Sequence, residues 1–191
     1  NIPDWYIQSC ERVQYLFPKA HAVAYVLMAY RIAYCKVHHP KHFYASYFTV
    51  RATDFDYTHV SKGSHYIKNF IKSVYQQGFR ASVLDKSIAT YLELANEMIE
   101  RGYEFEKVDL YKSHPTKFLI TEKGLRPPLA SLAGVGNNAA LSIAEARDVN
   151  NPFISREDLR QRAGIGKAVI ERLADVGVLD DLPESNQIDL F

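Results

Sequence analysis

Two glycine loops decide the fold, and they lie in segments that read LASLAGVGNNAALSIAEAR over residues 129–147 and LRQRAGIGKAVIERL over residues 159–173. Each segment predicts a short helix, a Gly-hydrophobic-Gly turn and a second helix that begins directly after the turn. Glycine permits a positive φ and lets another molecule approach the backbone closely. Gly134 and Gly164 lie thirty residues apart, so the two segments form an internal repeat of two units.

This repeat resembles a tandem helix-hairpin-helix, a family of motifs that bind DNA phosphates without reading base sequence. The helix after each loop presents unpaired N–H groups at its start, where a phosphate oxygen can accept them. The expected DNA-binding residues belong to the loops and the helix starts, and they are Gly134, Gly136, Asn137, Asn138, Gly164, Gly166 and Lys167. The second copy has Arg162 where the first has Leu132. Either Arg162 faces solvent or phosphate, or the second hairpin is mainly a structural partner.

Composition and charge limit how such binding can work. The chain has 191 residues, with 23 Lys and Arg against 22 Asp and Glu, so its formal net charge is +1. This balance excludes a general electrostatic attraction to nucleic acid, and any DNA binding must come from local geometry. Cys10 and Cys35 cannot form a disulfide framework. No apolar run approaches the roughly 20 residues of a membrane span, and the N-terminus lacks a signal-peptide pattern, so a soluble, cytoplasmic protein without membrane partners is expected.

The aromatic residues divide the chain. Thirteen of the 24 aromatic residues lie within residues 1–57, and only Phe153 and Phe191 lie beyond residue 123. Such a shift suggests two bodies with different functions. The helix signals predict a mainly α fold, with a short strand or hairpin near residues 116–120. The predicted helices before that strand span residues 4–14, 19–39, 41–50, 56–77 and 89–101.

The helix over residues 19–39 carries a second chemical signal at its start. Lys19 lies at the first turn, and His21 and Tyr25 share a face because they are four residues apart. A cation with aromatic rings at a helix start suits a nucleotide, but a packed helix with a satisfied histidine is the alternative. Further along, one face is expected to be packed, because apolar residues recur at steps of three and four at Val23, Val26, Leu27, Tyr30 and Tyr34.

Longer runs closely resemble the PolC family, the replicative DNA polymerase III alpha subunit of low-GC Gram-positive bacteria. These runs are FPKAHAVAYVLMAYRIAY at 17–34, HHP at 38–40, YASYFTVR at 44–51, IERGY at 99–103 and QIDLF at 187–191. The resemblance spans the whole chain and implies a C-terminal portion of such a polymerase. It implies the later fingers and their helical continuation at residues 1–112, the tandem helix-hairpin-helix domain at 113–183 and an extended tail at 184–191.

The resemblance also implies the chemistry of the full-length protein, a DNA-directed DNA polymerase, which is a nucleotidyltransferase. Lys19, His21 and Tyr25 would lie near the incoming dNTP, and the hairpins would hold duplex primer–template DNA. The family's catalytic Mg²⁺-binding aspartates belong to the palm, which no part of this chain resembles. No catalytic residue, metal ligand or cofactor is therefore expected in this segment, and alone it should be inactive.

Two clusters might be taken for metal sites. Asp54 and Asp56 form an Asp-x-Asp pair that resembles no palm motif, and a helix cap or solvated turn is expected there. A zinc site is not expected at the second cluster, which contains Cys35, His38, His39 and His42. Adjacent histidines on a helix point about 100° apart, so only His38 and His42 share a face, and Pro40 lies between them.

The last residues carry a third signal. Leu190 and Phe191 are adjacent apolar residues that follow a polar stretch without periodicity. The Gln-x-x-Leu-Phe pattern resembles the short peptide with which bacterial replication proteins bind the β sliding clamp. The residues expected to bind the clamp are Gln187, Ile188, Leu190 and Phe191. Two alternatives remain open at this stage, a stand-alone adaptor that binds DNA and the clamp without polymerase activity, and a purely structural domain.

Overall fold

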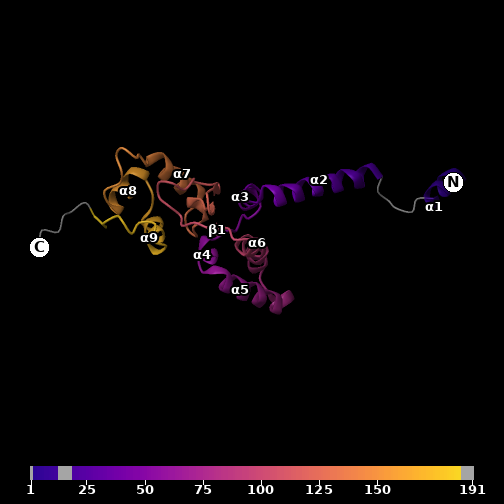
Figure 1. The fold of residues 1–191 in the computed structure, drawn as a ribbon, viewed down its shortest axis with the longest axis horizontal. Coiled ribbons are helices and arrows are strands. Elements are labelled where there is room, and N and C mark those ends of the chain that lie inside the picture. The colour runs from indigo at the N-terminus through magenta and orange to yellow at the C-terminus, as the bar shows by residue number, and fades with distance from the viewer. Residues whose placement is uncertain (1, 13–18, 186–191) are drawn as a thin grey trace, which may run out of the picture. The chain divides into compact units, whose positions relative to one another are not determined.

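The computed structural model describes residues 2–12 and 19–185, which divide into two compact units at residues 1–43 and 44–191 (Figure 1). The first unit contains α1 (Asp4–Arg12) and α2 (Lys19–His38), and α3 (Pro40–Val50) begins in it and continues into the second unit. These helices confirm the predicted ranges, and the last two residues predicted for α1 lie outside the described chain. The compact units divide at residue 43. The division predicted at residue 112 separates two functional parts of the chain, and it stays a prediction.

α2 departs from the expectation of a packed face. None of its residues is buried, and Val23, Val26 and Tyr30 are 64%, 68% and 69% exposed. Apolar side chains become buried only when another surface covers them, and the described part of this unit supplies no such surface. The apolar residues of α2 therefore recur along one face, but the predicted packing of that face is not observed in the described chain.

The second unit continues with four short or long helical segments, which are α4 (Tyr57–Val60), α5 (Gly63–Gln77), η1 (Gly78–Arg80) and α6 (Val83–Glu100). The single helix predicted over residues 56–77 is wrong, because Gly63 has a φ of 82° and separates α4 from α5. Asp56 caps α4, since its Oδ1 accepts a hydrogen bond from the Thr58 N–H at 2.9 Å, which confirms the expected helix cap. α6 begins before the predicted residue 89 because Ser82 caps it through the Asp85 N–H.

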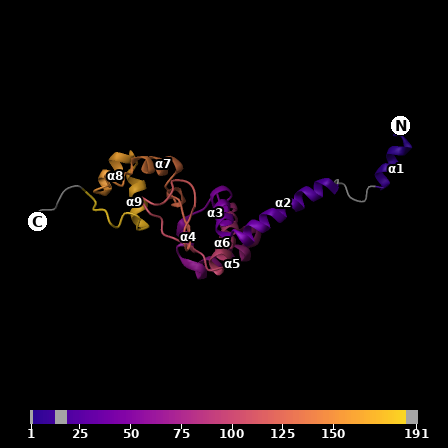
Figure 2. The same cartoon turned by 45° about the horizontal axis from the view of Figure 1, so that its top comes forward.

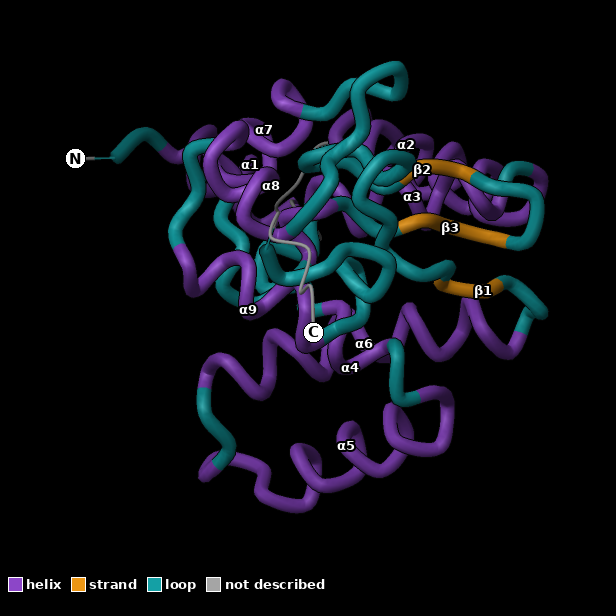
Figure 3. Tube along the Cα trace, turned by 90° about the vertical axis from the view of Figure 1, so that its left-hand side faces the viewer, coloured by secondary structure: helices purple, strands orange, loops and turns teal. Residues whose placement is uncertain are grey.

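A small sheet follows, with its strands drawn in orange in Figure 3. β1 (Glu104–Phe105) pairs in parallel with β3 (Gly124–Arg126), and β2 (Leu119–Ile120) pairs with the other edge of β3 in antiparallel fashion. The predicted hairpin is confirmed in β2 and β3, whereas β1 carried no strand signal. Gly124 is required by packing, because a Cβ at that position would lie 2.1 Å from the Glu104 carbonyl oxygen.

Aromatic side chains form the core that joins α3, α6 and the sheet. Phe48 lies at the centre with 2% exposure, and its ring centroid is 5.6 Å from that of Phe55 and 5.5 Å from that of Phe118. Phe55 also packs on Tyr91 of α6, with 5.0 Å between the ring centroids. Edge-to-face and tilted pairs at such separations stabilise beyond simple area burial. The aromatic enrichment of the early sequence is thus used in part to build this core.

The last helices of the described chain carry the glycine loops, and they gather at one end of the second unit (Figure 2). They are α7 (Asn137–Ala146), α8 (Arg156–Ala163) and α9 (Lys167–Asp175), preceded by the 3₁₀ turn η2 (Leu129–Ser131). The helix predicted before the first loop is thus reduced to one turn, because Pro127 and Pro128 exclude a helix directly before Leu129. Among the helices of the described chain, none is long and apolar enough to cross a membrane.

Candidate nucleic-acid interface

The first hairpin loop joins η2 to α7 through Gly134, Val135 and Gly136. Gly134 has a φ of 87°, which residues with a side chain rarely adopt. Val135 is 3% exposed and fixes the loop to the core. Gly136 is the N-cap of α7 and provides no side-chain acceptor. The first N–H groups of α7, from Asn137 onward, therefore lack an intrahelical acceptor and face outward at the loop.

The second hairpin loop repeats this geometry between α8 and α9. Gly164 has a φ of 62° and ends α8, with its N–H directed at the carbonyl oxygens of the last turn. Ile165 is 7% exposed and occupies the position of Val135. Gly166 is the N-cap of α9, again without a side-chain cap. The structure thus holds two helix N-termini of the same design, one in each copy of the repeat.

The two glycines of each loop have different conformations. Both loops have a positive φ, but only at the first glycine. Gly136 and Gly166 have φ values of −68° and −72° with extended ψ, which any residue can adopt. A Cβ at either position would meet nothing within 4 Å. The second glycine of each loop therefore leaves open space beside the helix start, where an external group can approach the backbone.

Arg172 connects the two hairpins. It lies on α9, and its Nε donates a hydrogen bond to the Ala133 carbonyl oxygen at 2.8 Å. Its Cγ would lie 3.6 Å from a Cβ on Gly134. A side chain of the second hairpin therefore braces the loop of the first, and the two loops belong to one surface.

Arg162 has a structural role, which decides the question left open by the sequence. Its guanidinium pairs with Asp158 at 3.2 Å and lies 4.5 Å over the Phe153 ring. It also donates hydrogen bonds to the main-chain carbonyl oxygens of Ala146, Asn151 and Pro152. Arg162 is thus used to hold the α7–α8 connection. The loop of the second hairpin stays open beside Gly166. The structural role of Arg162 therefore does not exclude this loop as an interface.

His114 holds the entry to the first hairpin. Its Nδ1 accepts hydrogen bonds from the Thr116 and Lys117 N–H groups, both at 3.0 Å, and its carbonyl oxygen accepts from the Leu129 N–H at the start of η2. Burial lowers the pKa of His114, and the nearby Lys117 and Arg147 lower it further. The neutral imidazole, with Nδ1 as an acceptor, is therefore the form that the fold favours.

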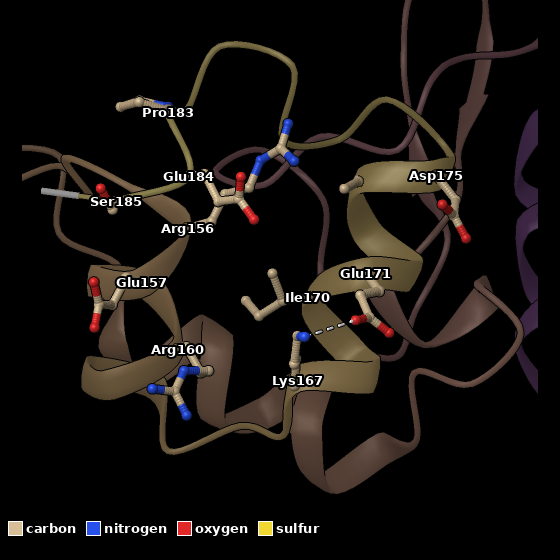
Figure 4. Close-up of a pocket in the computed structure, with 11 residues that line it drawn as sticks. Arg156, Glu157, Arg160, Lys167, Ile170, Glu171, Asp175, Pro183, Glu184 and Ser185 are labelled. Atoms are coloured by element: carbon tan, nitrogen blue, oxygen red, sulfur yellow. Dashed lines mark ion pairs between the residues drawn. The ribbon is translucent and has the colours of Figure 1, made fainter. Parts of the chain in front are cut away.

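A pocket of about 920 Å³ opens between α8, α9 and the segment at residues 183–185 (Figure 4). Arg160 and Lys167 line it from the two helices that flank the second loop, and Lys167 forms an ion pair with Glu171 at 3.6 Å. The basic lining is offset by four carboxylates, those of Glu157, Glu171, Asp175 and Glu184. Sequence reasoning missed Arg160, whose signal was a basic residue one turn before the loop glycine. The backbone N–H groups at the helix start add uncharged anion donors to this surface.

Comparison with known proteins agrees with this geometry. A helix-hairpin-helix motif model matches residues 102–188. Over all 191 residues, the chain is 56% identical to the PolC-type DNA polymerase III of Halalkalibacterium halodurans, 54% identical to that of Bacillus cereus and 52% identical to that of Bacillus subtilis.

The chain belongs to the PolC-type DNA polymerase III family.

This PolC-type chain spans only 13% of the length of each of these three relatives. The match nevertheless runs from one end of the chain to the other, so it includes both the aromatic unit and the two hairpins. The motif match begins at residue 102, earlier than the domain start predicted at residue 113. The family resemblance read from the sequence runs is confirmed.

The remaining predicted site residues of the PolC-type chain lie away from the hairpins in sequence. Lys19, His21 and Tyr25 are exposed in the first turns of α2, and the His21 and Tyr25 rings meet edge to face at 4.5 Å between centroids. These two rings share a face, as predicted. Gln187, Ile188, Leu190 and Phe191 lie outside the described residues.

The carboxylates and histidines of the described residues are candidate metal ligands. Within residues 2–12 and 19–185, no group of three or more His, Cys, Asp or Glu side chains could hold a metal ion. The Asp54 carboxylate accepts a hydrogen bond from the Ser87 hydroxyl at 2.5 Å, and Asp56 caps α4. Both carboxylates therefore have structural partners.

Proposed function

We propose that this chain binds duplex DNA through its two hairpin loops without reading base sequence, as part of a PolC-type replicative DNA polymerase. The observation that carries this proposal is the repeated loop, in which an uncapped helix N-terminus follows a glycine with open space beside it. Backbone N–H groups and the N-terminal end of the helix dipole favour a phosphate oxygen at that point. Because every nucleotide carries the same phosphate, such contacts position the duplex but carry no sequence information.

Binding of the 191-residue chain to two fluorescent duplexes of unrelated sequence tests this function. We expect equal Kd values for the two duplexes and a marked loss of affinity between about 50 and 200 mM salt, because phosphate contacts release counterions. Fluorescence anisotropy measures both effects. A Kd that differs between the two duplexes by tenfold or more would contradict binding through the backbone alone.

The polymerase activity of the full-length protein is a second part of this proposal. The chain would hold the primer–template, and nucleotidyl transfer would be performed by the palm of the longer protein with its Mg²⁺. The described residues do not fit that Mg²⁺ themselves, since they contain no group of three ligands. On this view the 191-residue chain alone shows DNA binding without DNA synthesis.

The start of α2 would serve the incoming nucleotide. Lys19 can meet a phosphate and Tyr25 can contact a base, and both side chains are exposed near one helix end. In the full-length enzyme, Lys19→Ala or Tyr25→Ala should raise KM for the nucleotide or lower kcat, with DNA affinity unchanged. Normal kinetics for both variants would remove these residues from the nucleotide site. His21 packs on Tyr25 and would orient its ring.

A further inference from the structure

The tip of the α5–α6 hairpin exposes a patch of apolar side chains. Phe79 in η1 is fully exposed, and Val83 at the start of α6 is 86% exposed. Tyr75 and Leu84 lie near them in sequence and are 64% and 56% exposed. The hairpin forms the lower part of the second unit in Figure 3. Single exposed apolar residues are ordinary, but a cluster of this kind marks an interaction surface.

The exposure of Phe79 is built into the turn. Gly78 has a φ of 54° and ends α5. The interior between the two helices is filled by Val74, Ala81 and Ala89, with Phe70 packed against them. Because the hairpin is already closed without Phe79, its ring adds nothing to the core and remains available to a partner.

The charges around Phe79 indicate what that partner carries. Lys72 lies on the same face of α5 as Tyr75, Arg80 follows Phe79 directly, and Lys86 lies one turn after Val83. None of these three cations forms an ion pair with another described residue. The acidic neighbours are engaged, since Asp85 accepts a hydrogen bond from the Ser82 hydroxyl and Glu93 accepts one from the Tyr75 hydroxyl. The surface thus combines an open aromatic ring with three cations that form no ion pair, beside two carboxylates that keep their negative charge and offset the cations in part.

We propose that this tip binds unpaired nucleic acid, with Phe79 stacked on a base and Lys72, Arg80 and Lys86 facing the adjoining phosphates. An aromatic ring among cations is the pattern by which proteins bind single strands without sequence preference, because every base has a π face. A duplex keeps its base faces stacked on one another, so this surface is separate from the hairpin loops that face duplex phosphates.

Tryptophan fluorescence of the 191-residue chain tests the stacking directly. The only tryptophan is Trp5, so Trp5→Phe removes the background signal and Phe79→Trp then places one indole at the tip. Addition of a short oligothymidylate should quench this emission, with a Kd within about twofold of the wild-type value. Phe79→Ala and Phe79→Leu should each weaken oligothymidylate binding about tenfold, since neither residue stacks on a base. Val149 is an apolar residue beside Asp148 that is 84% exposed, so Val149→Ser is the matched control. This variant should leave oligothymidylate binding unchanged.

Three further results decide the proposal. Replacing Lys72, Arg80 and Lys86 by Gln together should reduce the salt slope of single-strand binding by about 2. All tip variants should keep the wild-type Kd for duplex DNA, so a failure here is distinguishable from a failure of the hairpin proposal. An indole that is not quenched at saturating oligothymidylate would overturn the stacking. Wild-type oligothymidylate binding by Phe79→Leu but not by Phe79→Ala would also overturn it, because that result indicates an apolar contact in place of ring stacking.

Discussion

At the scale of single residues, the two glycines of each hairpin loop have different roles. The first glycine allows the turn, and the second leaves the space in front of the helix start. Gly136 and Gly166 therefore offer substitutions that affect binding more than folding.

Gly136→Ala and Gly166→Ala, introduced together, should weaken duplex binding about tenfold, because each methyl group occupies the space beside N–H groups that a charged phosphate would use. The melting temperature should fall only slightly, since alanine is a poorer N-cap than glycine by about 1 kcal/mol at most. Anisotropy and a thermal melt measure the two effects. Gly134→Ala is the contrasting variant, and it should destabilise by about 1–2 kcal/mol because alanine disfavours a φ of 87°. Full duplex affinity in the double variant would place the phosphates elsewhere.

Two basic residues of the second hairpin should respond in opposite ways. Lys167 is exposed and borders the open loop, so Lys167→Gln should reduce the salt slope of duplex binding by about 1 and leave stability unchanged. Arg162 holds three main-chain carbonyl groups, so Arg162→Gln should lower the free energy of unfolding by about 1–3 kcal/mol without changing the slope. The reverse assignment would show that Arg162 faces phosphate after all. Urea titration and affinity measured over a range of salt concentrations distinguish the cases.

At the scale of elements, the sequence predicted what local signals encode. α2 and α3 match their predicted ranges because Pro18 and Pro40 mark their starts. The early start of α6 was missed although Ser82 and Asp85 form a capping pattern, and β1 was missed because two residues carry no periodicity. The loop glycines and their helix starts were predictable. The braces of Arg172 and Arg162 were not, because they join residues that only the tertiary fold brings together.

The loop before the first hairpin should respond to acid. The pKa of His114 is lowered in the fold, so the unfolded chain takes up a proton first as the pH falls. The free energy of unfolding should therefore decrease between about pH 7.5 and about pH 5.5, around the ordinary pKa of about 6.5 for histidine. His114→Asn keeps a side-chain acceptor that does not titrate, and it should show a smaller decrease. His59, whose pKa burial also lowers, contributes with the same sign and remains in both proteins. An equal decrease in the variant would assign the effect to other groups.

At the scale of the whole molecule, the chain matches only a part of each of its relatives. Its relatives are about seven to eight times as long, and α2 carries an apolar surface that nothing in the described chain covers. The sequence predicted that this face is packed, but none of its residues is buried in the described chain. The domain boundary predicted between residues 112 and 113 is crossed by a core contact, because the rings of Phe48 and Phe118 pack on each other.

The tail gives a prediction for the full-length enzyme. Deletion of residues 187–191 should abolish binding to the β sliding clamp, because burial of Leu190 and Phe191 would supply roughly 1.5–3 kcal/mol each before ordering costs. DNA synthesis without the clamp should stay nearly intact. Surface plasmon resonance on immobilised clamp, together with primer extension in its absence, measures both. Unchanged clamp affinity after the deletion would show that the tail is not the contact.

The brace from Arg172 to the first loop has a consequence for movement. Because it fixes one loop against the other hairpin, the two phosphate contacts proposed for the loops would keep a constant separation while a duplex passes. A replicating enzyme advances by one base pair at a time, and each advance brings an equivalent pair of phosphates to the same two points. Contacts of this kind return to the same energy after every step, so they can hold the product duplex firmly and still let it slide without a sequence-dependent pause.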